Sequence, residues 1–279
     1  MITLNSDAAS TSLSKTTKAI LNEYGIKLNK NLGQNYLIDR NKRDQIIQFG
    51  NLTKDDVVLE IGPGIGTLTI ELAKRVKKVI AIEQDSNICQ ILENRLKKEN
   101  IDNVELINDD ALNVEFPKFD KIISNLPYQI SSPITFKFLN YDFQLAILMY
   151  QKEFASRMNG KVGSKDYSRL SAMLYFKCDV DLLTGVSAES FIPKPKVDST
   201  VVRLTPKLPE LNGQLKHLNI NEINEKDFKT YSKFVKALFQ HRNKKVKNAL
   251  IDSRHIITDL DKKEMKAKLN SMKNFYLKE

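Results

Sequence analysis

Short apolar runs alternate with amphipathic stretches along the middle of the chain. The runs are rich in β-branched residues and almost continuously apolar, which is typical of strands buried on both faces. They are predicted at residues 57–61, 78–83, 104–107, 119–124 and 145–150. Between them apolar positions recur at helical spacing, as over 68–73 and after Ser86, which is predicted to cap its helix. Strands alternating with helices predict right-handed βαβ units and a parallel sheet.

The pattern changes in the last part of the chain. Two further strands are predicted at 180–186 and 199–204, and the prolines at 206–209 then break regular structure. Beyond them the spacing predicts an amphipathic helix over 228–239 and another helix near 262–269, with a basic helix between the two. The chain therefore ends in a small helical region.

Charge is distributed unevenly. The 279 residues carry a formal net charge of +10, and residues 207–279 hold 17 Lys and Arg against nine Asp and Glu. The densest run is 241–247. Such a surface attracts nucleic acid, although charge alone also fits a solvated helix face. We expect a flexible tail at 1–26, an α/β domain at 27–206 and a small basic helical domain at 207–279.

Composition argues against several classes of protein. No stretch approaches 18 uninterrupted apolar residues, so no membrane span is predicted. Cys89 and Cys178 lie far apart, which argues against a disulfide framework and fits a reducing compartment such as the cytoplasm. The three histidines have no metal-binding spacing, and no metal is predicted.

A glycine-rich loop joins the first predicted strand to its helix. Gly62 and Gly64 allow positive φ angles and a close approach of the backbone to a ligand. The dinucleotide fingerprint needs a third glycine where Thr67 stands, so NAD is disfavoured. Glu83 at the second strand end is suited to ribose hydroxyls, and Asp110 at the third to an adenine amine. Either acid alone is better explained as a helix N-cap or an exposed turn. Together with the glycine loop they indicate an adenosine-type ligand, and the lack of a pyrophosphate cradle favours S-adenosylmethionine.

The fourth strand ends in a tetrad suited to amine chemistry. The exocyclic nitrogen of adenine is a poor nucleophile because its lone pair is delocalised into the ring. The Asn125 side chain and the Leu126 carbonyl could each accept one of its N–H groups and aim the lone pair at a methyl group. Pro127 stiffens the turn, and Tyr128 offers a ring for stacking. Positioning beside a sulfonium donor can then supply most of the catalysis.

From about residue 27 to residue 253 the chain strongly resembles the small-subunit ribosomal RNA adenine dimethyltransferase family. The sequence of its middle and C-terminal motifs is closest to the archaeal and eukaryotic branch of that family. The motifs that carry the resemblance are 32–37, 59–64, 125–128, 151–153, 167–171, 193–199 and 239–245. The resemblance implies a Rossmann-like S-adenosylmethionine-dependent methyltransferase domain with a small C-terminal helical subdomain.

Residue roles also follow from the resemblance. It implies that the cofactor is bound by Gln34, Asn35, Leu37, Gly62, Gly64, Glu83, Asp110 and Asn125. It implies a catalytic set of Asn125, Leu126, Pro127, Tyr128 and Phe191. Tyr128 and Phe191 would stack on opposite faces of a flipped adenine.

The implied reaction is N6,N6-dimethylation of two adjacent adenosines near the 3′ end of small-subunit rRNA. The implied setting is an immature 30S-type subunit during ribosome biogenesis, with the enzyme as a cytoplasmic monomer whose basic tail contacts rRNA. Two alternatives stay open. One is methylation of large-subunit rRNA adenine, as in the macrolide-resistance relatives, although the motifs at 193–199 and 241–245 favour the small-subunit group. The other is a non-catalytic rRNA-binding assembly or transcription factor, which would not need the tetrad. A DNA adenine methyltransferase is disfavoured because Leu126 stands where proline is more usual.

Overall fold

The computed structural model describes most of the chain, namely residues 12–26, 35–207, 225–241 and 243–276. The chain divides into two compact units. The first contains residues 1–156 and 179–206, and the second contains residues 157–178 and 207–279. No helix in the described part is both long enough and apolar enough to cross a membrane.

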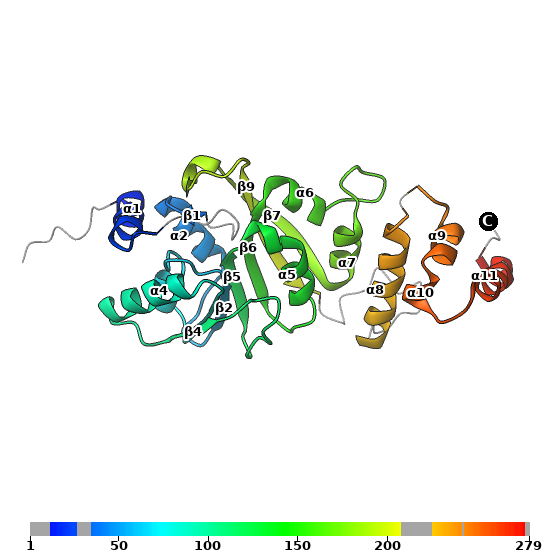
Figure 1. The fold of residues 1–279 in the computed structure, drawn as a ribbon, viewed down its shortest axis with the longest axis horizontal. Helices are drawn as coiled ribbons and strands as arrows, with labels where there is room; N and C mark the ends of the chain where they lie inside the picture. Colours follow the sequence, from blue (N-terminus) through cyan, green and yellow to red (C-terminus); the bar gives the residue numbers. More distant parts are fainter. Residues whose placement is uncertain (1–11, 27–34, 208–224, 242, 277–279) are drawn as a thin grey trace, which may run out of the picture. The chain divides into compact units, whose positions relative to one another are not determined.

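A seven-stranded sheet lies at the centre of the first unit (Figure 1). Its strands are β2 (Val57–Ile61), β3 (Lys78–Glu83), β4 (Val104–Asn108), β5 (Lys121–Asn125), β6 (Leu145–Gln151), β7 (Cys178–Val186) and β9 (Ser199–Pro206). Their order is β4-β3-β2-β5-β6-β9-β7. The first five strands run parallel, and β9 is antiparallel to β6. The α/β fold with a parallel sheet, predicted from the alternation of strands and helices, is confirmed.

Burial explains why the strands read as apolar runs. Val58 and Leu59 of β2 are fully buried, as is Val79 of β3. The helices between the strands are α3 (Thr69–Ala73), α4 (Ser86–Lys98) and α5 (Ser131–Phe138). Helix α3 packs on β3, and α4 packs on β3 and β4.

The predicted cap of α4 was wrong by one residue. Asp85 is the N-cap, and its carboxylate accepts N–H groups of Asn87 at 3.0 Å and Ile88 at 3.4 Å. The hydroxyl of Ser86 instead donates to the side-chain oxygen of Asn108 at 2.7 Å. A carboxylate is the stronger acceptor for the exposed N–H groups at a helix start.

The described part of the expected tail is partly helical. Helix α1 (Leu13–Glu23) is N-capped by Ser12, and its Ile20 and Leu21 pack in one apolar cluster with Tyr36 and Ile65. Helix α2 (Arg40–Phe49) follows a small antiparallel ladder of β1 (Tyr36–Leu37) with β8 (Phe191–Ile192). Helix α1 has an apolar face, but the segment as a whole is polar, so the sequence analysis did not predict a packed helix there.

The second unit is helical. Its helices are α7 (Arg169–Lys177), α8 (Glu225–Phe239), α9 (Val246–Asp252), α10 (Arg254–Ile257) and α11 (Lys262–Tyr276), while α6 (Lys152–Met158) crosses the boundary between the units. The unit takes in residues 157–178, which the sequence analysis had assigned to the α/β domain. The Tyr231 hydroxyl donates to the Ala172 carbonyl at 3.0 Å, and the Tyr231 and Phe176 rings lie 4.0 Å apart. These contacts join α7 to α8.

Candidate functional site

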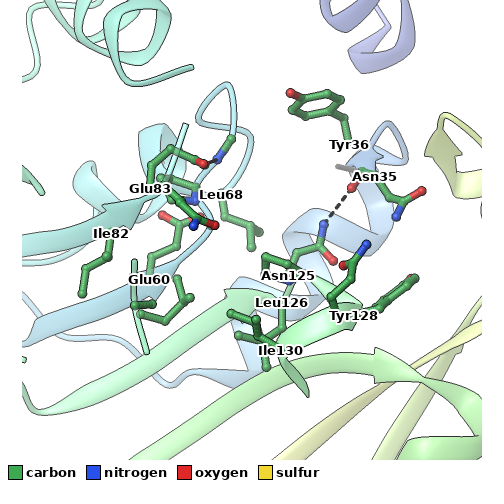
Figure 2. A pocket seen from close by; sticks show the side chains of 18 of the residues that line it. Asn35, Tyr36, Glu60, Leu68, Ile82, Glu83, Asn125, Leu126, Tyr128 and Ile130 are labelled. Carbon is green, nitrogen blue, oxygen red and sulfur yellow. Dashed lines mark hydrogen bonds between the residues drawn. The ribbon is translucent and has the colours of Figure 1, made fainter. Parts of the chain in front are cut away.

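A cavity opens at the carboxyl ends of four neighbouring strands, β2, β3, β4 and β5 (Figure 2). Its lining includes these residues that the sequence analysis singled out: Asn35, Leu37, Gly62, Gly64, Glu83, Asp110, Asn125, Leu126, Pro127 and Tyr128. The structure therefore brings the glycine loop, both carboxylates and the tetrad around one shared hollow. This is the position at which open α/β sheets bind ligands.

The glycine loop forms one wall of the cavity. Gly62 has φ +67°, and its N–H donates to the carbonyl of Ile82 at 2.9 Å. A Cβ atom at Gly62 would lie 3.0 Å from Cγ of Pro127, so a side chain there would meet the tetrad. Glycine is needed at this position both for the left-handed backbone and for the narrow gap.

Glu83 ties the end of β3 to the glycine loop. One carboxylate oxygen accepts the N–H of Gly64 at 3.2 Å, and the other accepts the N–H of Asp85 at 3.0 Å. Burial raises the pKa of Glu83, while these backbone N–H groups act against that rise. Each carboxylate oxygen can accept more than one hydrogen bond, so the pair can also receive ribose hydroxyls.

Asp110 closes the turn after β4. Its carboxylate accepts the N–H of Leu112 at 2.9 Å and a side-chain N–H of Asn113 at 3.3 Å. These bonds fix the orientation of a half-buried acid that lines the cavity. In the described chain no helix begins directly after Asp110, so it caps a turn and not a helix, and it also lines the cavity.

A hydrogen bond determines the orientation of the Asn125 side-chain amide. Its side-chain nitrogen donates to the backbone oxygen of Asn35 at 3.1 Å (Figure 2). Because that acceptor is a carbonyl, the amide nitrogen must be the atom that faces it. The amide oxygen is thus the end of the side chain that can accept an N–H from a substrate.

Tyr128 opens the three-residue helix η3 (Tyr128–Ile130) directly after Pro127. Its ring is half-buried and lines the cavity. The hydroxyl lies 2.5 Å from the hydroxyl of Ser199 at the start of β9. Burial raises the pKa of Tyr128, and the bond to Ser199 lowers it in part.

Among the predicted site residues that the structure describes, Phe191 is not found in the cavity lining. Phe191 is only 2% exposed and packs in the main apolar core. Its strand β8 pairs with β1, where Phe191 lies opposite Leu37, and this pairing explains its core position. Gln34 lies outside the described residues.

Glu60 belongs to the site but received no role from the sequence. It is 2% exposed, lines the cavity, and its Oε2 atom has no hydrogen-bond partner among the described residues. Burial raises the pKa of Glu60 to about 8. The sequence did contain a signal for Glu60, namely an acid inside an otherwise apolar strand. Burying an unpaired acid costs folding free energy, so such residues are often found at functional sites.

The charges around the cavity select for the kind of ligand. Glu83, Asp109 and Asp110 all line it, and its lining in the described chain contains no Lys, Arg or His. Acids without cations repel a pyrophosphate and attract a positively charged ligand. Together with the narrow gap at Gly62, this lining fits S-adenosylmethionine, whose sulfonium is cationic. No cluster of three or more potential metal ligands is found in the described part of the chain.

Comparison with known families decides the assignment. Residues 25–275 match the family model described as "Ribosomal RNA adenine dimethylase". The chain belongs to the ribosomal RNA adenine dimethylase family. This membership confirms the Rossmann-like methyltransferase fold, the S-adenosylmethionine cofactor and the rRNA adenine dimethyltransferase activity that the sequence predicted.

Individual proteins show how close the similarity is. A "Probable ribosomal RNA small subunit methyltransferase A" of Methanosphaera stadtmanae is 50% identical over 92% of this chain and 89% of that protein. The crystal structure of a dimethyladenosine transferase from Plasmodium falciparum is 31% identical, with a TM-score of 0.69 over 86% of this chain and 88% of that one. The 23S rRNA methyltransferase ErmE is 27% identical, with a TM-score of 0.61 over 84% and 88% of the two chains. The predicted resemblance to the small-subunit group is confirmed.

Proposed function

We propose that the protein dimethylates two adjacent adenosines near the 3′ end of small-subunit rRNA, using the cavity residues as its catalytic machinery. S-adenosylmethionine supplies an electrophilic methyl group attached to a sulfonium sulfur, which departs as a neutral thioether with the electrons of the broken C–S bond. The exocyclic nitrogen of adenine forms the new C–N bond and then releases one proton to water. A second transfer gives the dimethylated base.

The chain's own residues position that nitrogen. The Asn125 oxygen and the Leu126 carbonyl accept its N–H groups, and the Tyr128 ring stacks on the base. Glu83 and Asp110 bind the ribose and the adenine of the cofactor. The observation that carries the proposal is the bond from Asn125 to Asn35, because it leaves the amide oxygen as the acceptor for the substrate.

The proposed partner is an immature small ribosomal subunit in the cytoplasm, bound by a monomer of this chain. The relatives named for small-subunit methylation support the choice of rRNA. Exposed Lys245 and other lysines of the second unit support contacts with its phosphates. Cys89 and Cys178 are both buried and are not joined in a disulfide, which is compatible with a reducing compartment.

Methylation of large-subunit rRNA is the competing function, because ErmE matches most of the chain. A single experiment separates the two. Unmethylated small subunits and large-subunit rRNA are each incubated with the enzyme and S-adenosylmethionine, and methylated adenosines are located by mass mapping.

We expect two adjacent dimethyladenosines near the 3′ end of the small-subunit rRNA and none in the large-subunit rRNA. Asn125→Ala should abolish the signal while RNA affinity stays within about threefold, and exposed Asn140→Ala should retain it. Methylation confined to large-subunit rRNA would overturn the proposal, and an unchanged rate in Asn125→Ala would overturn the role of the tetrad.

A further inference from the structure

The Tyr128 and Ser199 hydroxyls meet although their residues lie 71 positions apart in the sequence. Their oxygens are 2.5 Å apart, a short hydroxyl–hydroxyl hydrogen bond. Tyr128 belongs to the tetrad, whereas Ser199 ends the motif at 193–199. Nothing in the reaction described above uses that motif, and this contact joins its last residue to the tetrad.

Ser199 is a rigid anchor. It is 1% exposed, begins β9 and lies opposite Gln151 of β6 in the sheet. The neighbouring Asp198 accepts the N–H of Ala188 at 2.9 Å through its side chain and the N–H of Lys152 at 2.9 Å through its carbonyl. The two bonds to Asp198 and the pairing with β6 therefore hold the backbone that carries the Ser199 hydroxyl.

Tyr128 has much weaker local support. It lies in a three-residue helix that has no side-chain cap, and its half-buried ring lines the cavity. The turn at Pro127 fixes the base of the side chain, since the N–H of Ile130 donates to the Pro127 carbonyl at 3.2 Å. The bond to Ser199 fixes the other end. A side chain held at both ends cannot change its χ1 rotamer without breaking that bond.

We propose that Ser199 is a positioning residue for methyl transfer, whose hydroxyl holds the Tyr128 ring in the orientation that faces the target adenine. This inference rests on the proposed stacking role of Tyr128. Loss of the bond lets the ring leave that orientation, so the base is presented in line with the methyl donor less often. The rate of the chemical step falls, while cofactor binding stays unchanged.

The chain contains a matched pair for comparison. The hydroxyls of Thr135 and Tyr150 lie 2.7 Å apart, and both residues are fully buried. Neither lines the cavity. Tyr150→Phe removes a tyrosine hydroxyl from such a bond and leaves Thr135 bonded to the Ser131 carbonyl. This variant is the control for a general loss of stability.

The test is a double-mutant cycle with Ser199→Ala, Tyr128→Phe and the double variant. Single-turnover methyl transfer to small subunits is measured at saturating cofactor, and cofactor affinity is measured by calorimetry. We expect each single variant to be about tenfold slower, as for the loss of one hydrogen bond of about 1.4 kcal/mol. The double variant should be no slower than either single one, because all three lack the same bond. Cofactor affinity should be unchanged, and Tyr150→Phe should react at the wild-type rate.

Three results would overturn the inference. These are a wild-type rate in Ser199→Ala, a double variant slowed by the product of the single effects, or a matching slowdown in Tyr150→Phe. A further variant, Tyr128→Ala, tests the underlying role separately. If it reacts at the wild-type rate, the stacking role in the proposed function is wrong. If it is inactive while Ser199→Ala and Tyr128→Phe react normally, only the positioning role fails.

Discussion

The side-chain nitrogen of Asn125 donates to the backbone oxygen of Asn35 at 3.1 Å, so the segment before β1 fixes the amide at the end of β5. Two motifs that lie 90 residues apart in the sequence thereby act as one unit. The bond also makes Asn125 hard to replace by an acid of the same shape.

Asn125→Asp should therefore inactivate the enzyme, although it only replaces the side-chain NH2 group by an oxygen. A carboxylate has no N–H to donate, and it would face the Asn35 carbonyl oxygen with a second acceptor. We expect single-turnover methyl transfer to fall about 100-fold, which corresponds to about 2.7 kcal/mol in the barrier. Exposed Asn140→Asp is the control. A rate within threefold of wild type would show that the amide orientation is not used.

Glu83→Ala should weaken cofactor binding. The substitution removes the acceptor for the ribose and also releases the N–H groups of Gly64 and Asp85. Hydrogen bonds to a charged group are worth about 1.5–3 kcal/mol, so calorimetry should show a Kd about 10- to 100-fold higher. Glu115→Ala, at an exposed site, should bind normally. Equal affinities for Glu83→Ala and wild type would refute the assignment.

Gly64→Ala should separate backbone strain from crowding at the site. Gly64 has φ +55°, and an added Cβ would lie 2.9 Å from the Tyr36 ring. Gly163 has φ +84° with nothing within 4 Å of an added Cβ, so Gly163→Ala imposes the strain alone. Both variants should lose about 1 kcal/mol of stability in urea unfolding. Only Gly64→Ala should also bind the cofactor at least tenfold more weakly, and equal binding by both variants would contradict crowding by Tyr36.

The sheet and the cavity could be predicted from the sequence because both depend on local patterns. The boundaries of β2 and β3 agree with the apolar runs at 57–61 and 78–83. Glu83 at the end of β3 and Asn125 at the end of β5 share one edge of the parallel sheet, so a common cavity for them follows without any knowledge of the loops.

Features that depend on long-range pairing were missed. The core position of Phe191 follows from the β1–β8 ladder, and two-residue strands leave no periodic signal in the sequence. The grouping of residues 157–178 with the second unit follows from contacts such as Tyr231 to Ala172. The bond between Tyr128 and Ser199 was missed for the same reason, because the motif at 193–199 gives no indication of its partner.

Glu60 should make the protein less stable as pH rises. Burial raises the pKa of Glu60 to about 8 from an ordinary value of 4.5, so the folded chain holds this proton more tightly than the unfolded chain. The stability that the group contributes is complete below about pH 4.5 and is lost as pH rises towards 8. Glu60→Gln cannot lose a proton, so its stability relative to wild type should rise across this window, by up to about 1.4 kcal/mol per pH unit. Urea unfolding at several pH values measures the difference, with exposed Glu93→Gln as the control. Parallel pH profiles for Glu60→Gln and wild type would contradict the prediction.

Lysines of the basic run should differ in how much they contribute to RNA binding. Lys244 and Lys245 are both exposed, but Lys244 forms an ion pair with Asp252 at 2.7 Å. Arg242 in the same run lies outside the described residues. A lysine that neutralises a phosphate displaces counterions, so each lost contact should flatten the plot of log K against log salt by about 0.7–0.9. We expect Lys245→Gln to flatten the slope by that amount and Lys244→Gln by less, because Lys244 is already paired. Lys118→Gln, an exposed site in the first unit, makes the same change in net charge and should leave the slope unaltered. If all three variants give the wild-type slope in filter binding to small-subunit rRNA, these lysines are solvated surface residues and not RNA contacts.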